Sequence, residues 1–260
     1  MFRDPLSSTY DILAWGNFSA AHVTQVDTAT IHALPAHVQT IVDRRWDEAL
    51  ARATEEGRRL FNALVYRLDD LRVHDGRMHI SYGRTCYRDY AMTRGTCAAK
   101  PWANNPDPIG SAVIASTTDG FIPLGRRSRS ADVNPGRYFT FGGFFDPEDV
   151  NESGNADIFQ CAAREWKEET GLMISPDNLS LISVVYDLVH PHPEIGFFTR
   201  LQQSRKEISK SDWAAELDDL IFLQEDKLVD FARANADEFV DSLLGAIEAF
   251  GLSTMGDQKL

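Results

Sequence analysis

Apolar residues recur at two spacings in the first third of the chain, and these spacings predict a small mixed unit. Over residues 37–56 they return every three or four positions, as on the buried face of an amphipathic helix. Short strand-like runs lie on both sides of that helix, over residues 10–28, 61–73 and 77–83. The last two flank Asp75-Gly76, a dipeptide typical of a tight hairpin. We therefore expect an N-terminal α+β unit.

A loop and a second series of elements follow. Residues 101–108 contain three prolines and two asparagines, so we place a domain boundary there, with an N-terminal unit over 1–105 and a second domain over 106–260. The patterns then predict a helix over 156–170 and strands over 109–116, 120–127, 137–145, 179–188 and 195–201. Asp119-Gly120, between the first two of these strands, predicts another hairpin turn. This order of elements predicts an α/β sandwich.

The C-terminal part of the chain, residues 224–252, has a mostly helical pattern. Its apolar positions form a stripe made of Leu228, Phe231, Phe239, Leu243, Leu244, Ile247 and Phe250. Such a stripe is typical of core packing or of contact with a second copy of the chain, rather than of a ligand site. The sequence leaves both open, and a homodimer is one expectation.

Composition narrows the class of protein. The 260 residues are 43% hydrophobic and 10% aromatic, which is too apolar for a disordered chain, and no apolar stretch reaches the roughly 18 residues of a membrane-spanning helix. The net charge of -13 argues against nucleic acid or anionic lipid as the main partner. Asp4 interrupts the segment that a secretory signal would keep apolar. The cysteines Cys86, Cys97 and Cys161 form no Cys-x-x-Cys pair, so we expect a cytoplasmic protein without structural zinc.

The most informative stretch is Arg-Glu-Trp-Lys-Glu-Glu-Thr-Gly-Leu, which begins at Arg164 and ends at Leu172. On a helix, Glu165, Glu168 and Glu169 lie at i, i+3 and i+4 and share one face. Adjacent carboxylates repel one another unless a cation lies between them, and oxygen ligands of this type suit Mg²⁺ or Mn²⁺ bound jointly with substrate phosphates. The alternative is a solvated acidic face, paired with basic residues of the same helix.

The complete string resembles the signature of the Nudix hydrolase family, G-x5-E-x7-R-E-U-x-E-E-x-G-U, in which U is a bulky apolar residue. Its last nine positions match, with Trp166 and Leu172 as the apolar residues. The resemblance implies a Nudix-type α/β/α sandwich and a metal-dependent hydrolase of nucleoside diphosphates linked to another group. It also implies that Glu165, Glu168 and Glu169 hold Mg²⁺ or Mn²⁺.

The front half of the signature departs from the family pattern. The glycine is expected 14 residues before Arg164, whereas Gly142 and Gly143 lie 22 and 21 residues before it. The loop is therefore expanded, and Ala156 occupies the position of the expected glutamate. Four acids are candidates for the missing carboxylate: Glu148, Asp149, Glu152 and Asp157.

A narrower resemblance runs from about residue 40 to residue 172. It rests on a helix that carries Trp46 and on short strings at 81–90, 95–96, 107–110, 124–128 and 135–137. This layout looks like the Nudix subgroup that contains the animal UDP-glucose pyrophosphatase and its plant relatives. The resemblance implies hydrolysis of a UDP-sugar to UMP and a sugar 1-phosphate. The alternatives are an ADP-ribose pyrophosphatase and a non-catalytic nucleotide-binding sensor, which the absent loop glutamate motivates.

The implied reaction gives further residues a role. A carboxylate would deprotonate the attacking water, and Glu169 and Glu216 are the two candidates for this base. Arg164 is expected to hold a glutamate of the signature in place rather than to contact substrate. The candidate substrate contacts are Arg127, from the basic cluster Arg126, Arg127 and Arg129, then Tyr87, Arg88 and Asp89, and the loop residues His190, His192 and Glu194. For each of them the alternative is ordinary packing or a solvated charge.

Overall fold

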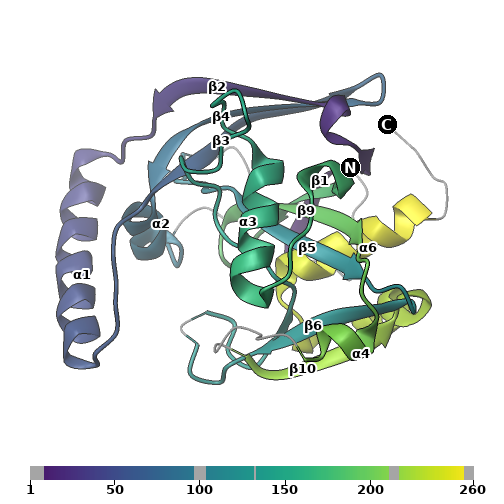
Figure 1. Ribbon diagram of the computed structural model, residues 1–260. Coiled ribbons are helices and arrows are strands. Elements are labelled where there is room, and N and C mark those ends of the chain that lie inside the picture. Colours follow the sequence, from purple (N-terminus) through teal and green to yellow (C-terminus); the bar gives the residue numbers. More distant parts are fainter. Residues whose placement is uncertain (1–8, 97–103, 132, 211–216, 255–260) are drawn as a thin grey trace.

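The computed structural model describes residues 9–96, 104–131, 133–210 and 217–254 (Figure 1). Within these ranges the strands are β1 (Tyr10–Phe18), β2 (Val23–Ile31), β3 (Leu64–His74), β4 (Arg77–Cys86), β5 (Gly110–Ser116), β6 (Phe121–Arg127), β7 (Tyr138–Phe139), β8 (Ser180–Asp187), β9 (His192–Arg200) and β10 (Leu217–Gln224). The helices are α1 (Ala36–Glu55), α2 (Tyr87–Thr93), α3 (Ile158–Thr170), α4 (Arg205–Ile208), α5 (Leu228–Ala234) and α6 (Asp241–Thr254).

A mixed sheet of order β1-β8-β9-β5 forms the middle layer, with β5 parallel to β9 and the other pairs antiparallel. Because side chains alternate along a strand, consecutive residues face opposite layers. In β5, Val113 belongs to the apolar cluster on the α3 side and Ile114 to the cluster on the α6 side. Val184 and Val185 divide in the same way in β8. The sheet thus lies between α3 and α6 (Figure 1), and the predicted α/β/α sandwich is confirmed.

A second sheet has the order β10-β6-β7, and it shows that the hairpin predicted at Asp119-Gly120 is wrong. Strands β5 and β6 form as expected, but Gly120, at φ +78°, joins two strands of different sheets. Strand β5 is buried along its whole length and pairs with β9 in the central sheet, whereas β6 pairs with β10 in the second sheet. The third strand expected over 137–145 is also shorter, because only Tyr138–Phe139 pairs in a ladder before the two glycines.

The N-terminal residues build a third sheet, of order β2-β4-β3. The hairpin predicted at Asp75-Gly76 is confirmed, since it joins β3 to β4 with φ of +51° and +69°. The helix predicted over 37–56 is also confirmed as α1. Strand β1, by contrast, pairs with β8 in the central sheet, so residues assigned to the N-terminal unit complete the sandwich. The domain division at 105 and 106 stays a prediction.

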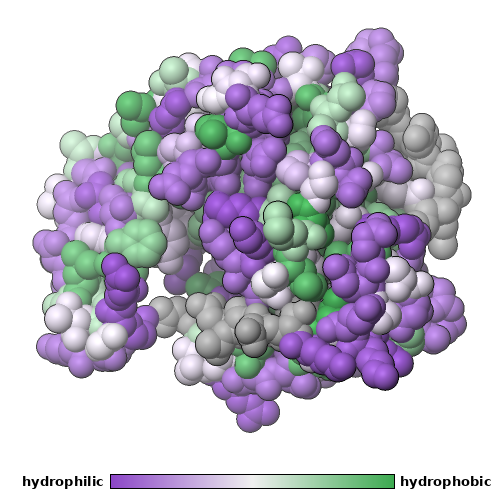
Figure 2. All heavy atoms as spheres, in the orientation of Figure 1, coloured by the Kyte–Doolittle hydropathy of each residue, from purple (hydrophilic) through white to green (hydrophobic). Residues whose placement is uncertain are grey.

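The apolar stripe at the C-terminal end is buried inside this chain. Leu243, Ile247 and Phe250 of α6 are at most 5% exposed and belong to one cluster with Ile182 and Val185 of β8. This stripe therefore needs no second copy to cover it. Among the described helices, none combines the length and the apolar character needed to cross a bilayer. The face seen in Figure 2 is mainly hydrophilic, with hydrophobic side chains scattered among polar ones.

Candidate active site

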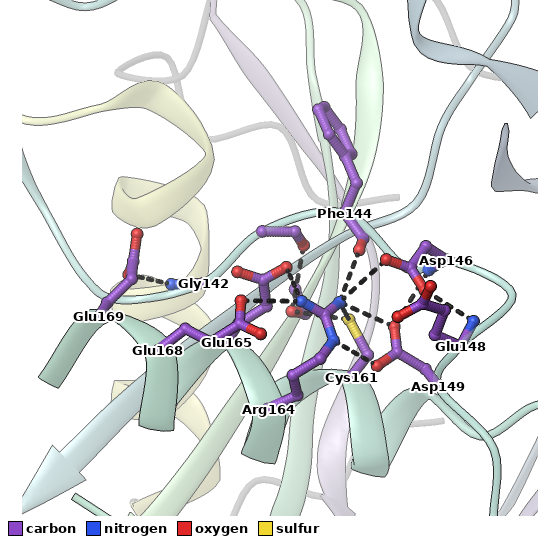
Figure 3. Close-up of polar contacts among 12 residues, drawn as sticks. Gly142, Phe144, Asp146, Glu148, Asp149, Cys161, Arg164, Glu165, Glu168 and Glu169 are labelled. Atoms are coloured by element: carbon purple, nitrogen blue, oxygen red, sulfur yellow. Dashed lines mark hydrogen bonds and ion pairs between the residues drawn. The ribbon is translucent and has the colours of Figure 1, made fainter. Parts of the chain in front are cut away.

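Helix α3 orients the acidic residues of the signature. Its N-cap Asp157 accepts a hydrogen bond from the Phe159 amide, and Gly171, at φ +70°, ends it. The helix buries Phe159, Cys161, Ala162 and Trp166 completely against the central sheet. That packing fixes the rotation of the helix, so that Glu165, Glu168 and Glu169 share one side next to the buried face, as the spacing predicts (Figure 3).

Two glycines allow the loop after β7 to pass directly beside these carboxylates. The Gly142 amide donates a hydrogen bond of 2.9 Å to Oε2 of Glu169 (Figure 3). A Cβ on Gly143 would lie 2.5 Å from both carboxylate oxygens of Glu165, and one on Gly142 would collide with the Ser111 carbonyl oxygen. Gly142 leaves no room for a side chain, and Gly143 leaves room only if the Glu165 carboxylate moves, so the glycine pair and the carboxylates pack directly together.

The Gly143→Ala substitution is therefore expected to push the Glu165 carboxylate out of position. Because a displacement of about 1 Å in an active site can cost about 100-fold in rate, we expect kcat to fall by roughly that factor. The measurement is kcat beside the melting temperature. Gly95→Ala is the matched control, since a Cβ on Gly95 meets open space. A Gly143→Ala enzyme with normal kcat would contradict the assignment of Glu165 to the site.

Arg164 lies between the acids of the helix and those of the expanded loop (Figure 3). It makes a two-pronged pair with Asp149, with Nε and Nη2 at 2.7 and 2.9 Å from the carboxylate oxygens. Its Nη1 donates to Glu165 at 2.7 Å and to Glu168 at 3.2 Å. The hydrogen bonds to Asp149 hold the pKa of Arg164 well above its usual value. These contacts give Arg164 the positioning role that the sequence predicts.

Asp149 is the acid that the expanded loop brings to Arg164. Its side chain is 1% exposed, although it comes from a loop. Among the three other candidate acids, Asp157 caps α3 and accepts from Gln25, whereas Glu148 and Glu152 are exposed. The spacing of the family signature does not lead to Asp149, because the extra residues of the loop change the register.

A cavity of about 250 Å³ lies on the other side of the glycine pair, whose members Gly142 and Gly143 line it. Four aromatic residues line it as well: Tyr87, Tyr90, Phe139 and Phe144. Arg94, Asp187, His190, His192, Glu194 and Ser242 are among its polar lining residues. The glycine pair thus contacts the Glu165 and Glu169 carboxylates and also lines the cavity.

The basic cluster predicted at the end of β6 is divided by the fold. Arg127 lines the cavity and lies with its guanidinium carbon 5.1 Å from the centre of the Phe139 ring. Arg126 instead donates to the Tyr138 hydroxyl and to Glu238. The exposed Arg129 bonds Asp218 through its backbone amide. Arg127 alone of the three is therefore a cavity residue.

Of the predicted substrate contacts in the N-terminal segment, Tyr87 lies at the cavity and Arg88 does not line it. Tyr87 lines the cavity, but Arg88 pairs with Asp43 and Asp89. Tyr90, which the sequence did not single out, lines it too and lies 3.3 Å from Nδ1 of His192. A stacking role for Tyr87 therefore stays a prediction. Arg88 forms ion pairs with carboxylates outside the cavity lining, and its predicted contact with substrate also stays a prediction.

His192 begins strand β9 rather than lying in a loop. Its Nδ1 is 2.5 Å from the His190 carbonyl oxygen, and its Nε2 is 3.9 Å from Oε2 of Glu194. Burial lowers the pKa of His192, but Glu194 and Asp187 outweigh burial and raise it. Burial lowers the pKa of His190. Glu216 lies outside the described residues.

The acidic side of α3 suits a divalent cation by its chemistry. Burial raises the pKa of Glu165 above the usual value, and Glu168 and Asp149 add to this shift while Arg164 opposes it. Arg164 shares its charge among Asp149, Glu165 and Glu168. Within the described ranges, no three Asp, Glu, His or Cys side chains are grouped so that they could hold a metal ion as they stand. The oxygen donors and the excess of negative charge fit a hard ion. In the structure these carboxylates are paired with Arg164 and with the Gly142 amide.

Comparison with known proteins places these features in a family. The model of the NUDIX domain matches residues 107–243. No curated protein matches the sequence. Among solved structures, the chain is similar to the MutT protein from Methanosarcina mazei Go1, with 17% identity, 59% of this chain and 97% of that chain covered, and a TM-score of 0.41.

Two further solved structures have similar scores. A mutT/nudix family protein from Listeria innocua has 18% identity over 59% of this chain and 97% of that chain, with a TM-score of 0.39. A bifunctional NMN adenylyltransferase/ADP ribose pyrophosphatase from Francisella tularensis has 14% identity over 57% of this chain and 42% of that chain, with a TM-score of 0.38.

Proposed function

This chain belongs to the NUDIX family and is a Nudix hydrolase, and we propose that its substrate is a UDP-sugar, which it cleaves to UMP and a sugar 1-phosphate. The observation that carries this proposal is the placement of the α3 carboxylates against the glycine pair that lines the cavity. A diphosphate at the glycine pair would lie beside Glu165 and Glu169. The rest of the nucleotide would occupy the aromatic-lined cavity.

Glu165, Glu168 and Glu169 are the residues that would hold Mg²⁺ or Mn²⁺. The bound ion would supply positive charge against the diphosphate oxygens. Glu169 is our candidate to accept a proton from the attacking water, since its carboxylate lies at Gly142, on the wall of the cavity. Glu216 stays the second candidate for this base. Asp149 and Arg164 would keep Glu165 and Glu168 in place.

The substrate class is supported by the N-terminal segment that carries the narrower resemblance. Helix α2 belongs to that segment, and its Tyr87 and Tyr90 line the cavity. An exposed face of Tyr87 would stack on a nucleobase, and Arg127 would donate to the acceptor oxygens of the nucleotide. Nucleic acid and membranes are not expected as partners. A cytoplasmic location and a homodimer also stay predictions.

The test is release of nucleoside monophosphate by the full chain from UDP-glucose in the presence of Mg²⁺, beside ADP-ribose at the same concentrations. UMP is expected from UDP-glucose. Faster turnover of ADP-ribose would keep the hydrolase and replace the substrate. Tight binding of UDP-glucose without any product over hours would favour the nucleotide sensor, which Ala156 at the place of the loop glutamate motivates.

A further inference from the structure

The cavity has a polar wall that the proposed roles do not use. Asp187, at the end of β8, lines the cavity and is 1% exposed. Its Oδ1 accepts hydrogen bonds of 2.7 Å from the amides of Val189 and His190. Its Oδ2 is buried and has no hydrogen-bond partner among the described residues. A buried carboxylate oxygen without a donor is costly, and this one belongs to a cavity residue, so a bound ligand can supply the donor.

Ser242, in the first turn of α6, lies on the same wall. It lines the cavity, is 1% exposed, and its hydroxyl likewise has no hydrogen-bond partner within the described part of the chain. Burial raises the pKa of Asp187 to about 6, and the charge of Asp241, the residue before Ser242, adds to that shift. Strand β8 and helix α6 also pack against each other, with Val185 and Leu243 in one apolar cluster, so Asp187 and Ser242 both lie where these two elements meet at the cavity.

We propose that Asp187 and Ser242 form a recess that binds an uncharged, hydrogen-bond-donating part of the nucleotide substrate. The donor would be a hydroxyl of one of its sugars or the N–H of its base, given to Oδ2 of Asp187. The Ser242 hydroxyl can donate or accept, so it would pair with a neighbouring polar atom of the same group. This inference rests on the proposed function, because it specifies how that substrate is chosen.

The charges around the recess exclude a phosphate there. Asp187, Glu194 and the nearby Asp241 are carboxylates and would repel a phosphate group. His192 faces Asp187 across the β8–β9 ladder, whereas the arginines of the cavity, Arg94 and Arg127, belong to other parts of its lining sequence. We therefore expect the diphosphate at the glycine pair and the donor-bearing group at Asp187.

The test is the Asp187→Asn variant, assayed with UDP-glucose and Mg²⁺. Asparagine keeps Oδ1 for the two amides and replaces only the unpartnered oxygen, so the fold is expected to remain. We expect KM to rise about 10- to 100-fold, as for loss of a hydrogen bond to a charged group, with kcat nearly unchanged. Asp107→Asn is the matched control, because burial raises the pKa of Asp107 to about 6 as well, while its carboxylate bonds Tyr186.

Analogues of UDP-glucose identify the donor. They carry an N3-methyl group on the base or lack one hydroxyl of the ribose or the glucose, so that each donor is removed by one analogue. One analogue should raise KM for the wild-type enzyme but not for Asp187→Asn. If Asp187→Asn hydrolyses UDP-glucose with the same KM as the control Asp107→Asn, the recess is not a binding site, while the proposed function stands. A different result would keep the recess and overturn the proposed function. In that case the wild type would bind UDP-glucose in calorimetry without hydrolysing it, and Asp187→Asn would bind it more weakly.

Discussion

In the Glu169→Gln variant, kcat for hydrolysis of UDP-glucose is expected to fall by about 10²- to 10⁴-fold, the range usual for loss of a general base. The substitution removes a negative charge that a divalent ion would need and a group that can accept a proton. It leaves the fold in place, because a glutamine carbonyl can accept the 2.9 Å hydrogen bond from the Gly142 amide in the same way. The loss should therefore appear in turnover and not in stability.

The measurement is kcat together with the melting temperature. Glu48→Gln on α1 is the control, since it removes an exposed helical carboxylate far from α3 in the sequence. The variant should also need more Mg²⁺ for half-maximal rate than the wild type does, or show no rate at any concentration. Normal kcat in Glu169→Gln would remove Glu169 from the site and leave Glu216 as the candidate base.

The acidic face of α3 could be predicted from the sequence because a helix fixes spacing locally. Once residues 158–170 are helical, Glu165, Glu168 and Glu169 must share a side whatever the rest of the chain does. The buried Trp166 then sets which side faces the sheet. The sandwich follows from the order of the elements, because strands before and after one central helix, followed by a closing helix, supply a sheet with a helix for each face.

Features that depend on contacts between distant segments were not predicted. A short turn at Asp119-Gly120 is compatible with a hairpin, but β5 gains more by pairing with β9, which lies more than 70 residues later in the sequence. Strand β1 joins β8 across an even longer separation. Neither pairing leaves a signal in the local pattern, because any strand with the right faces can occupy those positions.

Some residues that line the cavity could be predicted from the sequence and others could not. Tyr87 and Arg127 were singled out by their strings and do line it. Asp187 and Ser242 come from the end of a strand and the start of a helix, and neither position is unusual as sequence. What distinguishes them is burial without a partner, which exists only once β8 and α6 are packed. Recognition residues of this kind are visible only in the folded chain.

The pair between Asp149 and Arg164 should carry both stability and activity. The Asp149→Asn substitution leaves the guanidinium of Arg164, which is 26% exposed, facing an amide N–H₂ in place of a carboxylate oxygen. Removal of one partner of a fully buried pair typically costs about 3 kcal/mol or more of the free energy of unfolding, and because water reaches Arg164 we expect a loss of about 2 kcal/mol. Urea unfolding measures it. Asp146→Asn is the control, since that carboxylate is 30% exposed and 3.5 Å from Arg164, so its loss should cost about 1 kcal/mol or less.

The same substitution should lower turnover through Glu165. Arg164 would lose its two-pronged partner and turn toward Glu165 and Glu168, whose carboxylates it already contacts at 2.7 and 3.2 Å. Displaced carboxylates would hold the ion and the water less well, and we expect kcat to fall roughly 10-fold or more at a temperature where the variant is still folded. A destabilised Asp149→Asn with normal kcat would make Asp149 purely structural. A normal free energy of unfolding would show that Arg164 does not depend on the expanded loop.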